Sequence, residues 1–83
     1  MSMTEDKIRL QHICDAAQKI IAFTDGKNRE SLAEDSMLQF ALVRLVEIIG
    51  EAAARLSDDL KARYSGIPWV AIVGMRNRLV HAY

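Results

Sequence analysis

The sequence has little of several residue types. It holds one cysteine, one proline and five aromatic residues among 83. The single cysteine, Cys14, excludes an internal disulfide and suits a reducing cytosol. Arg44, Glu47 and Arg76 interrupt the apolar stretches, so no segment is long and apolar enough to span a bilayer. Basic and acidic residues balance at 11 each, so no overall charge indicates a nucleic-acid or membrane partner.

The composition is that of a folded protein. Hydrophobic residues make up 51% and charged residues 27%, which excludes a disordered or low-complexity chain. The length suffices for one small domain. The chain does not open with a basic start, an apolar core and a cleavage site, so we expect a cytoplasmic protein without a secretion signal.

The first 24 residues predict a helix from Thr4 to Thr24, with Thr4 as its N-cap. Its apolar stripe recurs at spacings of three and four and consists of Ile13, Ala17, Ile20 and Phe23. Gly26 is expected to end this helix. We expect His12 at or near the surface and Cys14 as a small packing residue.

A second helix is predicted to start at Ser31, because Ser31 and Glu34 have the spacing of a capping box. Its seam consists of Leu38, Leu42, Leu45, Ile49, Ala52 and Leu56. From Met37 to Ile49, ten of thirteen residues are apolar, more than one buried face requires. We therefore expect a homodimer with this helix at or near its interface.

The remainder of the chain also reads as helix. Ser57 is expected to cap a short helix that ends near Tyr64, and 65–67 form a break. Pro68 suits the first position of a last helix that runs to Tyr83, with Trp69 anchoring it in the core. No strand is required, so the sequence predicts an all-α fold, a small antiparallel helical bundle.

Charge is distributed unevenly along the chain. Residues 1–59 carry seven basic and eleven acidic residues, a formal −4, whereas 60–83 carry four basic residues and no acid. These four are Lys61, Arg63, Arg76 and Arg78. The basic segment suits an anion or phosphate site. For Lys61 and Arg63, a purely solvated surface is an equally good interpretation.

The last helix concentrates polar residues that are capable of chemistry. At about 100° per residue, Asn77 and His81 lie about 40° apart, and Tyr83 lies about 20° from Arg76. A histidine can transfer a proton near neutral pH, and an arginine can bind a phosphate and stabilise growing negative charge. A hydrogen-bonded cluster at a helix end would use the same residue types. Residue types alone do not separate the two interpretations.

These polar residues of the last helix also form part of a recognisable sequence motif. The segment 74–83, GMRNRLVHAY, resembles the signature of the HEPN superfamily, Arg-x4-His with Asn after the Arg. The tyrosine two residues after His81 is similar to that of the HepT-like branch, also called DUF86. Upstream, 47–53 (EIIGEAA) and 67–69 (IPW) resemble the same branch in the same order.

The resemblance implies a HEPN-like bundle that dimerises through the second and last helices, so that two Arg/His motifs face one composite cleft. It implies a toxin that is a metal-independent endoribonuclease without a cofactor. His81 would be the general acid/base, Arg76 would stabilise the phosphate and Asn77 would support the site. The antitoxin partner would be an MNT-type nucleotidyltransferase that transfers AMP to Tyr83.

The resemblance covers 1–83 as a single domain and implies that the family domain continues past Tyr83. The alternative function is a HEPN module that binds or dimerises without cutting RNA. Glu47 and Glu51, four residues apart, could orient Arg76 or His81. A solvated or salt-bridged pair is the simpler interpretation of these two carboxylates. Two histidines and one cysteine without shared spacing predict no zinc site.

Overall fold

The computed structural model describes the backbone of residues 3–82 and the side chains of residues 3–75 and 77. Helices account for most of this part of the chain, and it contains no strand. The helices are α1 (Met3–Thr24), α2 (Arg29–Glu34), α3 (Ser36–Ala54), α4 (Asp58–Arg63) and α5 (Trp69–Ala82). The predicted all-α fold is therefore confirmed.

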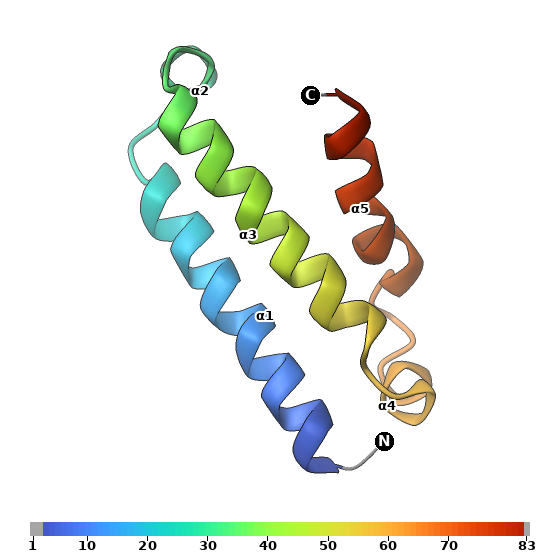
Figure 1. Cartoon of the computed structure of the whole chain (residues 1–83). Helices are drawn as coiled ribbons and strands as arrows, with labels where there is room; N and C mark the ends of the chain where they lie inside the picture. Colours follow the sequence, from blue (N-terminus) through green and yellow to red (C-terminus); the bar gives the residue numbers. More distant parts are fainter. Residues whose placement is uncertain (1–2, 83) are drawn as a thin grey trace.

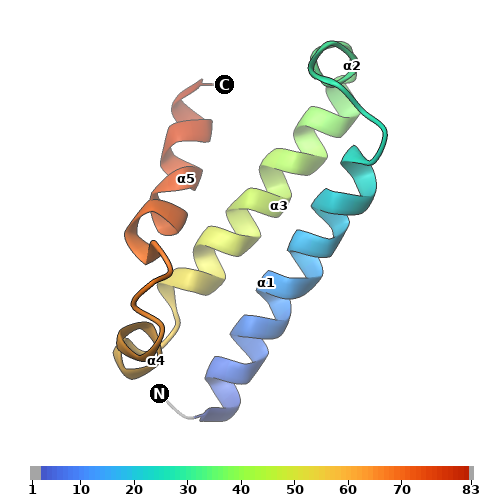
Figure 2. The same cartoon turned by 180° about the vertical axis from the view of Figure 1, so that it is seen from behind.

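The three long helices lie side by side with α3 in the middle (Figure 1). Neighbouring long helices run antiparallel, and the short helices α2 and α4 lie at opposite ends of α3 (Figures 1 and 2). Towards its C-terminal end, α5 diverges from α3 in both views. The predicted antiparallel bundle is thus a layer of three helices, with α1 and α5 at its edges.

Helix α1 has nearly the predicted bounds. It begins at Met3, so Thr4 is a helical residue and not the N-cap. Gly26 follows its end at φ +70°, a left-handed conformation that glycine adopts without steric cost. The predicted stripe is half-buried at Ile13, Ala17 and Ile20, whereas Phe23 is exposed. Ala16 is the buried apolar residue of this face, along which α1 packs against α3.

The predicted second helix is two helices. Asn28, not Ser31, is the N-cap of α2, and Ser31 is the third helical residue, whose side chain returns the hydrogen bond of a capping box. The chain then leaves the helical conformation at Asp35. The Asp35 carboxylate accepts a hydrogen bond from the backbone N–H of Leu38 at 3.0 Å and thereby caps α3. Gln39 joins the two helices by donating to the carbonyls of Leu32 and Ala33.

The seam of α3 is buried as predicted at Leu38, Leu45, Ala52 and Leu56, the last lying just past the helix end. Within one chain, two other helices already pack against α3, because α1 and α5 lie on different sides of it. The apolar excess of α3 therefore does not by itself require a second copy. Met37 and Phe40 near its start nevertheless remain 83% and 74% exposed.

Hydrogen bonds connect the start of helix α4 to the start of α1. Ser57 caps α4 as predicted, its hydroxyl accepting from the backbone N–H of Leu60 at 3.2 Å. The same hydroxyl donates to the buried carboxylate of Asp6 at 2.6 Å, and the Ser57 N–H donates to it at 2.9 Å. These two bonds lower the pKa of Asp6 below its ordinary value, because they stabilise the charged form.

Three smaller expectations differ from the structure. Pro68 lies one residue before α5, and its carbonyl accepts the first bond of the helix, from Ile72. Trp69 is half-buried, not a core residue, and its ring N–H donates to the carbonyl of Tyr64 at 3.1 Å. Cys14, expected as a small packing residue, is exposed. His12 is exposed, as predicted. Among the described helices, none combines the length and hydropathy needed to cross a membrane.

Candidate functional site

The motif residues lie on the second half of α5. The backbone is helical through Arg76, Asn77 and His81, so the predicted spacing of these residues is realised. The side chains of Arg76, Arg78 and His81, and Tyr83 as a whole, lie outside the described part. Their roles therefore remain predictions that rest on the helical backbone and on the side chain of Asn77.

Asn77 faces α3. Its exposed side chain lines a hollow of about 220 Å³ together with Val73 on the same helix. The α3 side of this hollow consists of Gly50, Glu51, Ala54 and Arg55. Gly50 is buried and, having no side chain, leaves room for this hollow on the α3 side. The structure thus brings Asn77 together with Glu51, which the sequence offered as a supporting residue only in the less simple of two interpretations.

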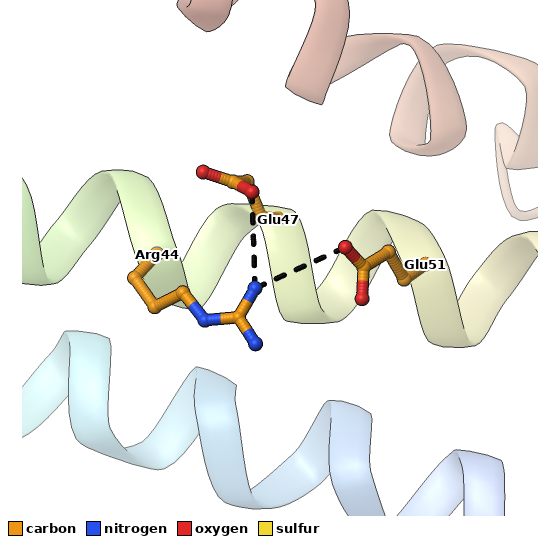
Figure 3. A network of polar contacts seen from close by, with 3 residues as sticks. All are labelled: Arg44, Glu47 and Glu51. Atoms are coloured by element: carbon orange, nitrogen blue, oxygen red, sulfur yellow. Dashed lines mark ion pairs between the residues drawn. The ribbon is translucent and has the colours of Figure 1, made fainter.

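Glu51 belongs to a group of three charged side chains along one face of α3. The Arg44 guanidinium lies 3.7 Å from Glu47 and 3.9 Å from Glu51 (Figure 3). The Glu47 side chain is 25% exposed, whereas Arg44 is 61% and Glu51 45% exposed. Exposed pairs of this kind contribute about 0–1 kcal/mol each, so their effect on stability is small.

These ion pairs agree with the simpler interpretation of the two glutamates as a salt-bridged pair. Their partner, Arg44, was not predicted, although its position three residues before Glu47 and seven before Glu51 places it on the same helix face. Arg55, which lines the hollow with Asn77, was also missed. It follows the last residue of α3, and only the fold brings it to α5.

His81 is one helical turn past Asn77 on α5. Asn77 and His81 lie about 40° apart around the helix. No group of three His, Cys, Asp or Glu side chains that could bind a metal ion occurs among the described residues.

The described basic side chains of α4, those of Lys61 and Arg63, do not line the hollow beside Asn77. Lys61 is half-buried and donates to the carbonyl of Ala54 at 3.4 Å, and Arg63 is exposed on α4. Helix α4 lies at the opposite end of the layer from the C-terminal end of α5 (Figure 2). For Lys61 and Arg63 the structure favours a solvated surface over a shared phosphate site.

Comparison with known proteins gives a consistent assignment. The family model described as "Ribonuclease HepT-like" matches residues 13–83. A candidate RNase from Methanocaldococcus jannaschii is 34% identical over all 83 residues, which span 76% of that protein. A protein named as a probable ribonuclease HepT from Thermococcus cleftensis is 39% identical over 74 residues, 89% of this chain and 67% of the relative. A candidate RNase from Caldanaerobacter subterraneus is 38% identical over 74 residues, 66% of its length.

No solved structure matches the chain. The family model covers the motif helix, both glutamates and most of the three-helix layer. Relatives that match along the entire chain carry ribonuclease names. The chain therefore belongs to the HepT-like ribonuclease family, a family of RNA-cleaving enzymes.

Proposed function

We propose that this protein is a metal-independent endoribonuclease and the toxin of a toxin–antitoxin pair. The observation that carries the proposal is the position of the motif on one helix. Asn77 lines a hollow shared with α3, and His81 follows one helical turn later on the same helix. Family membership supports RNA as the substrate.

The proposed reaction requires only the chain's own side chains. His81 takes the proton from a ribose 2′-hydroxyl, and the 2′ oxygen attacks the adjacent phosphorus. The bond from phosphorus to the 5′ oxygen breaks, and that oxygen takes up a proton as it leaves. The products are a 2′,3′-cyclic phosphate and a 5′-hydroxyl. Arg76 binds the phosphate oxygens and stabilises their growing charge.

Two copies are proposed to pair through α3 and α5, so that both motifs contribute to one cleft. The exposed Met37 and Phe40 on α3 support this interface, because apolar side chains of this size are unfavourable in water. Asn77 is proposed to orient the imidazole or the substrate. Glu47 and Glu51 are proposed to support Arg76 or His81 from α3, in addition to their ion pairs with Arg44.

The experiment compares His81→Ala with the matched variant His12→Ala, whose histidine is exposed on α1. Wild type and His12→Ala should arrest growth and cut RNA to cyclic-phosphate ends, also in the presence of a chelator. His81→Ala should lose cleavage by about 10²-fold or more and keep its sedimentation behaviour. Full cleavage by His81→Ala would refute the assignment and favour a module that binds without cutting.

The proposed regulation is transfer of AMP from ATP to the Tyr83 hydroxyl, with release of pyrophosphate, by an MNT-type nucleotidyltransferase in the cytoplasm. The added phosphate would place negative charge beside the motif and repel RNA. Co-expression of such an enzyme with wild type should add one adenylyl group and restore growth. Tyr83→Phe should escape both effects, whereas modification of Tyr83→Phe would place the acceptor elsewhere.

A further inference from the structure

We propose that Arg55 is a substrate-binding residue, which holds an RNA phosphate next to the one that is cut. This rests on the proposed function, because it assigns RNA to the hollow beside the motif. Arg55 follows the last residue of α3 and lines this hollow of about 220 Å³ opposite Val73 and Asn77 of α5. Among the described residues, it is the basic side chain of the hollow.

Arg55 has no counter-ion within the described part of the chain. Its side chain is exposed and takes part in no ion pair or side-chain hydrogen bond there. The other charged residue of the hollow is Glu51, whose carboxylate lies 3.9 Å from the Arg44 guanidinium, and this neighbour partly offsets its charge. A guanidinium that is not committed to a carboxylate can bind a phosphate through two parallel hydrogen bonds. Arg55 is therefore free to bind an anionic ligand.

The position of Arg55 relative to the motif indicates which phosphate it binds. Helices α3 and α5 run antiparallel, so later residues of α5 lie beside earlier residues of α3 (Figure 1). Asn77 lies beside 50–55, and His81, one turn later, lies beside an earlier part of α3. Arg55 and His81 are thus on opposite sides of Asn77 along α5. One helical turn of about 5.4 Å is comparable with the separation of successive phosphates in a single strand. A strand that is cut at His81 therefore places a neighbouring phosphate at Arg55.

Arg55 marks the end of the basic path that leads to the motif. The same side chain also lines a neighbouring hollow of about 510 Å³ at the start of α4. That hollow contains the acids Glu5 and Asp58 beside Arg9, so it does not favour a polyanion. From residue 60 onward, in contrast, the chain carries four basic residues and no acid. We therefore expect a phosphate contact at Arg55 and none beyond it.

The first test compares two arginines in steady-state cleavage of a short single-stranded RNA. Arg55→Gln should raise the KM about tenfold. The kcat should change by less than about twofold, because the lost contact holds the substrate and not the reacting atoms. Arg63→Gln removes the same charge from an exposed residue of α4 outside the hollow and should leave both constants unchanged. Arg55→Lys should recover part of the lost affinity. An unchanged KM for Arg55→Gln, or an equal rise for Arg63→Gln, would overturn the proposal.

The second test locates the phosphate in a set of RNAs, each with one phosphate replaced by a neutral methylphosphonate. Binding is measured with 2′-O-methyl RNA, which stays intact because it has no 2′-hydroxyl nucleophile. At one position, the methylphosphonate and Arg55→Gln should each weaken binding about tenfold, and together no further. At the other positions the two losses should multiply. Losses that multiply at every position would contradict a phosphate contact at Arg55.

The two tests also separate this contact from the nuclease assignment. If wild type binds RNA with the expected dependence on Arg55 but cuts none, the nuclease assignment fails and the contact stands. If wild type cuts RNA and the losses multiply at every position, the contact fails and the nuclease assignment stands. Absence of RNA binding by wild type would overturn both.

Discussion

Asp6 and Ser57 are 51 positions apart in the sequence and share two hydrogen bonds. Ser57 simultaneously caps α4, so its hydroxyl donates to Asp6 and accepts from the N–H of Leu60. This one side chain connects the start of α1 to the start of α4. The connection fixes the segment that leads from α3 into the motif helix.

The first prediction concerns pH. The folded state lowers the pKa of Asp6 below the ordinary value of 3.8 through the hydroxyl and the N–H of Ser57. The unfolded chain therefore binds the proton more readily. The stabilisation is complete above pH 3.8 and is lost as the pH falls through the folded pKa. Thermal unfolding of wild type from pH 2 to 7 should show this loss, and Asp6→Asn should flatten the profile. Asp15→Asn, exposed on the same helix, should retain the wild-type profile.

The second prediction concerns the break between α2 and α3. The Asp35 carboxylate caps α3 through the N–H of Leu38 at 3.0 Å. Asp35→Ala leaves this N–H without its acceptor and should lower the free energy of unfolding by about 1 kcal/mol in urea titrations. Asp35→Ser should recover most of that loss. A stable Asp35→Ala protein would indicate that α2 and α3 do not depend on this cap.

The third prediction separates stability from activity at Glu51. Its ion pair with Arg44 is long, at 3.9 Å, and both side chains are substantially exposed. Glu51→Gln should therefore change the free energy of unfolding by less than about 0.5 kcal/mol. Because Glu51 lines the hollow with Asn77, the same variant should slow RNA cleavage severalfold. Cleavage at the wild-type rate would show that the carboxylate does not support the motif.

The fourth prediction concerns Gly50, a buried residue of α3 in the wall of the same hollow. A leucine there would project into this hollow beside Val73 and Asn77, which should cost about 1–3 kcal/mol and disturb the motif helix. The rate of RNA cleavage should fall by a larger factor than the free energy of unfolding. The matched control is Gly66→Leu, because a Cβ added at Gly66 meets no atom within 4 Å. Similar losses in both variants would exclude a specific role for the α3–α5 contact.

The fifth prediction concerns Arg76. A lysine keeps the charge but cannot bind a phosphate through two parallel hydrogen bonds. Arg76→Lys should retain weak cleavage with a reduced kcat, and Arg76→Ala should lose cleavage. Single-turnover assays on a short RNA measure both. If Arg76→Lys cleaved at the wild-type rate, a simple positive charge would suffice at this position.

The sequence by itself determined which segments are helical and where the motif lies. Periodicity marks the seam from Leu38 to Leu56, Gly26 marks the end of α1, and Ser57 marks the cap of α4, because these are local properties of spacing and backbone conformation. The break at Asp35 was missed, because the capping-box spacing of Ser31 and Glu34 placed a single helix start before it, whereas Asp35 caps α3.

Only the tertiary structure decided which residues far apart in the sequence lie side by side. Arg55 and Asn77 are 22 positions apart, and Asp6 and Ser57 are 51 apart, and no local pattern links either pair. Their proximity results from α3 packing between two antiparallel neighbours, one on each side. Helix periodicity specifies which face of a helix is apolar, but the partner of that face depends on how the entire chain minimises its exposed apolar surface.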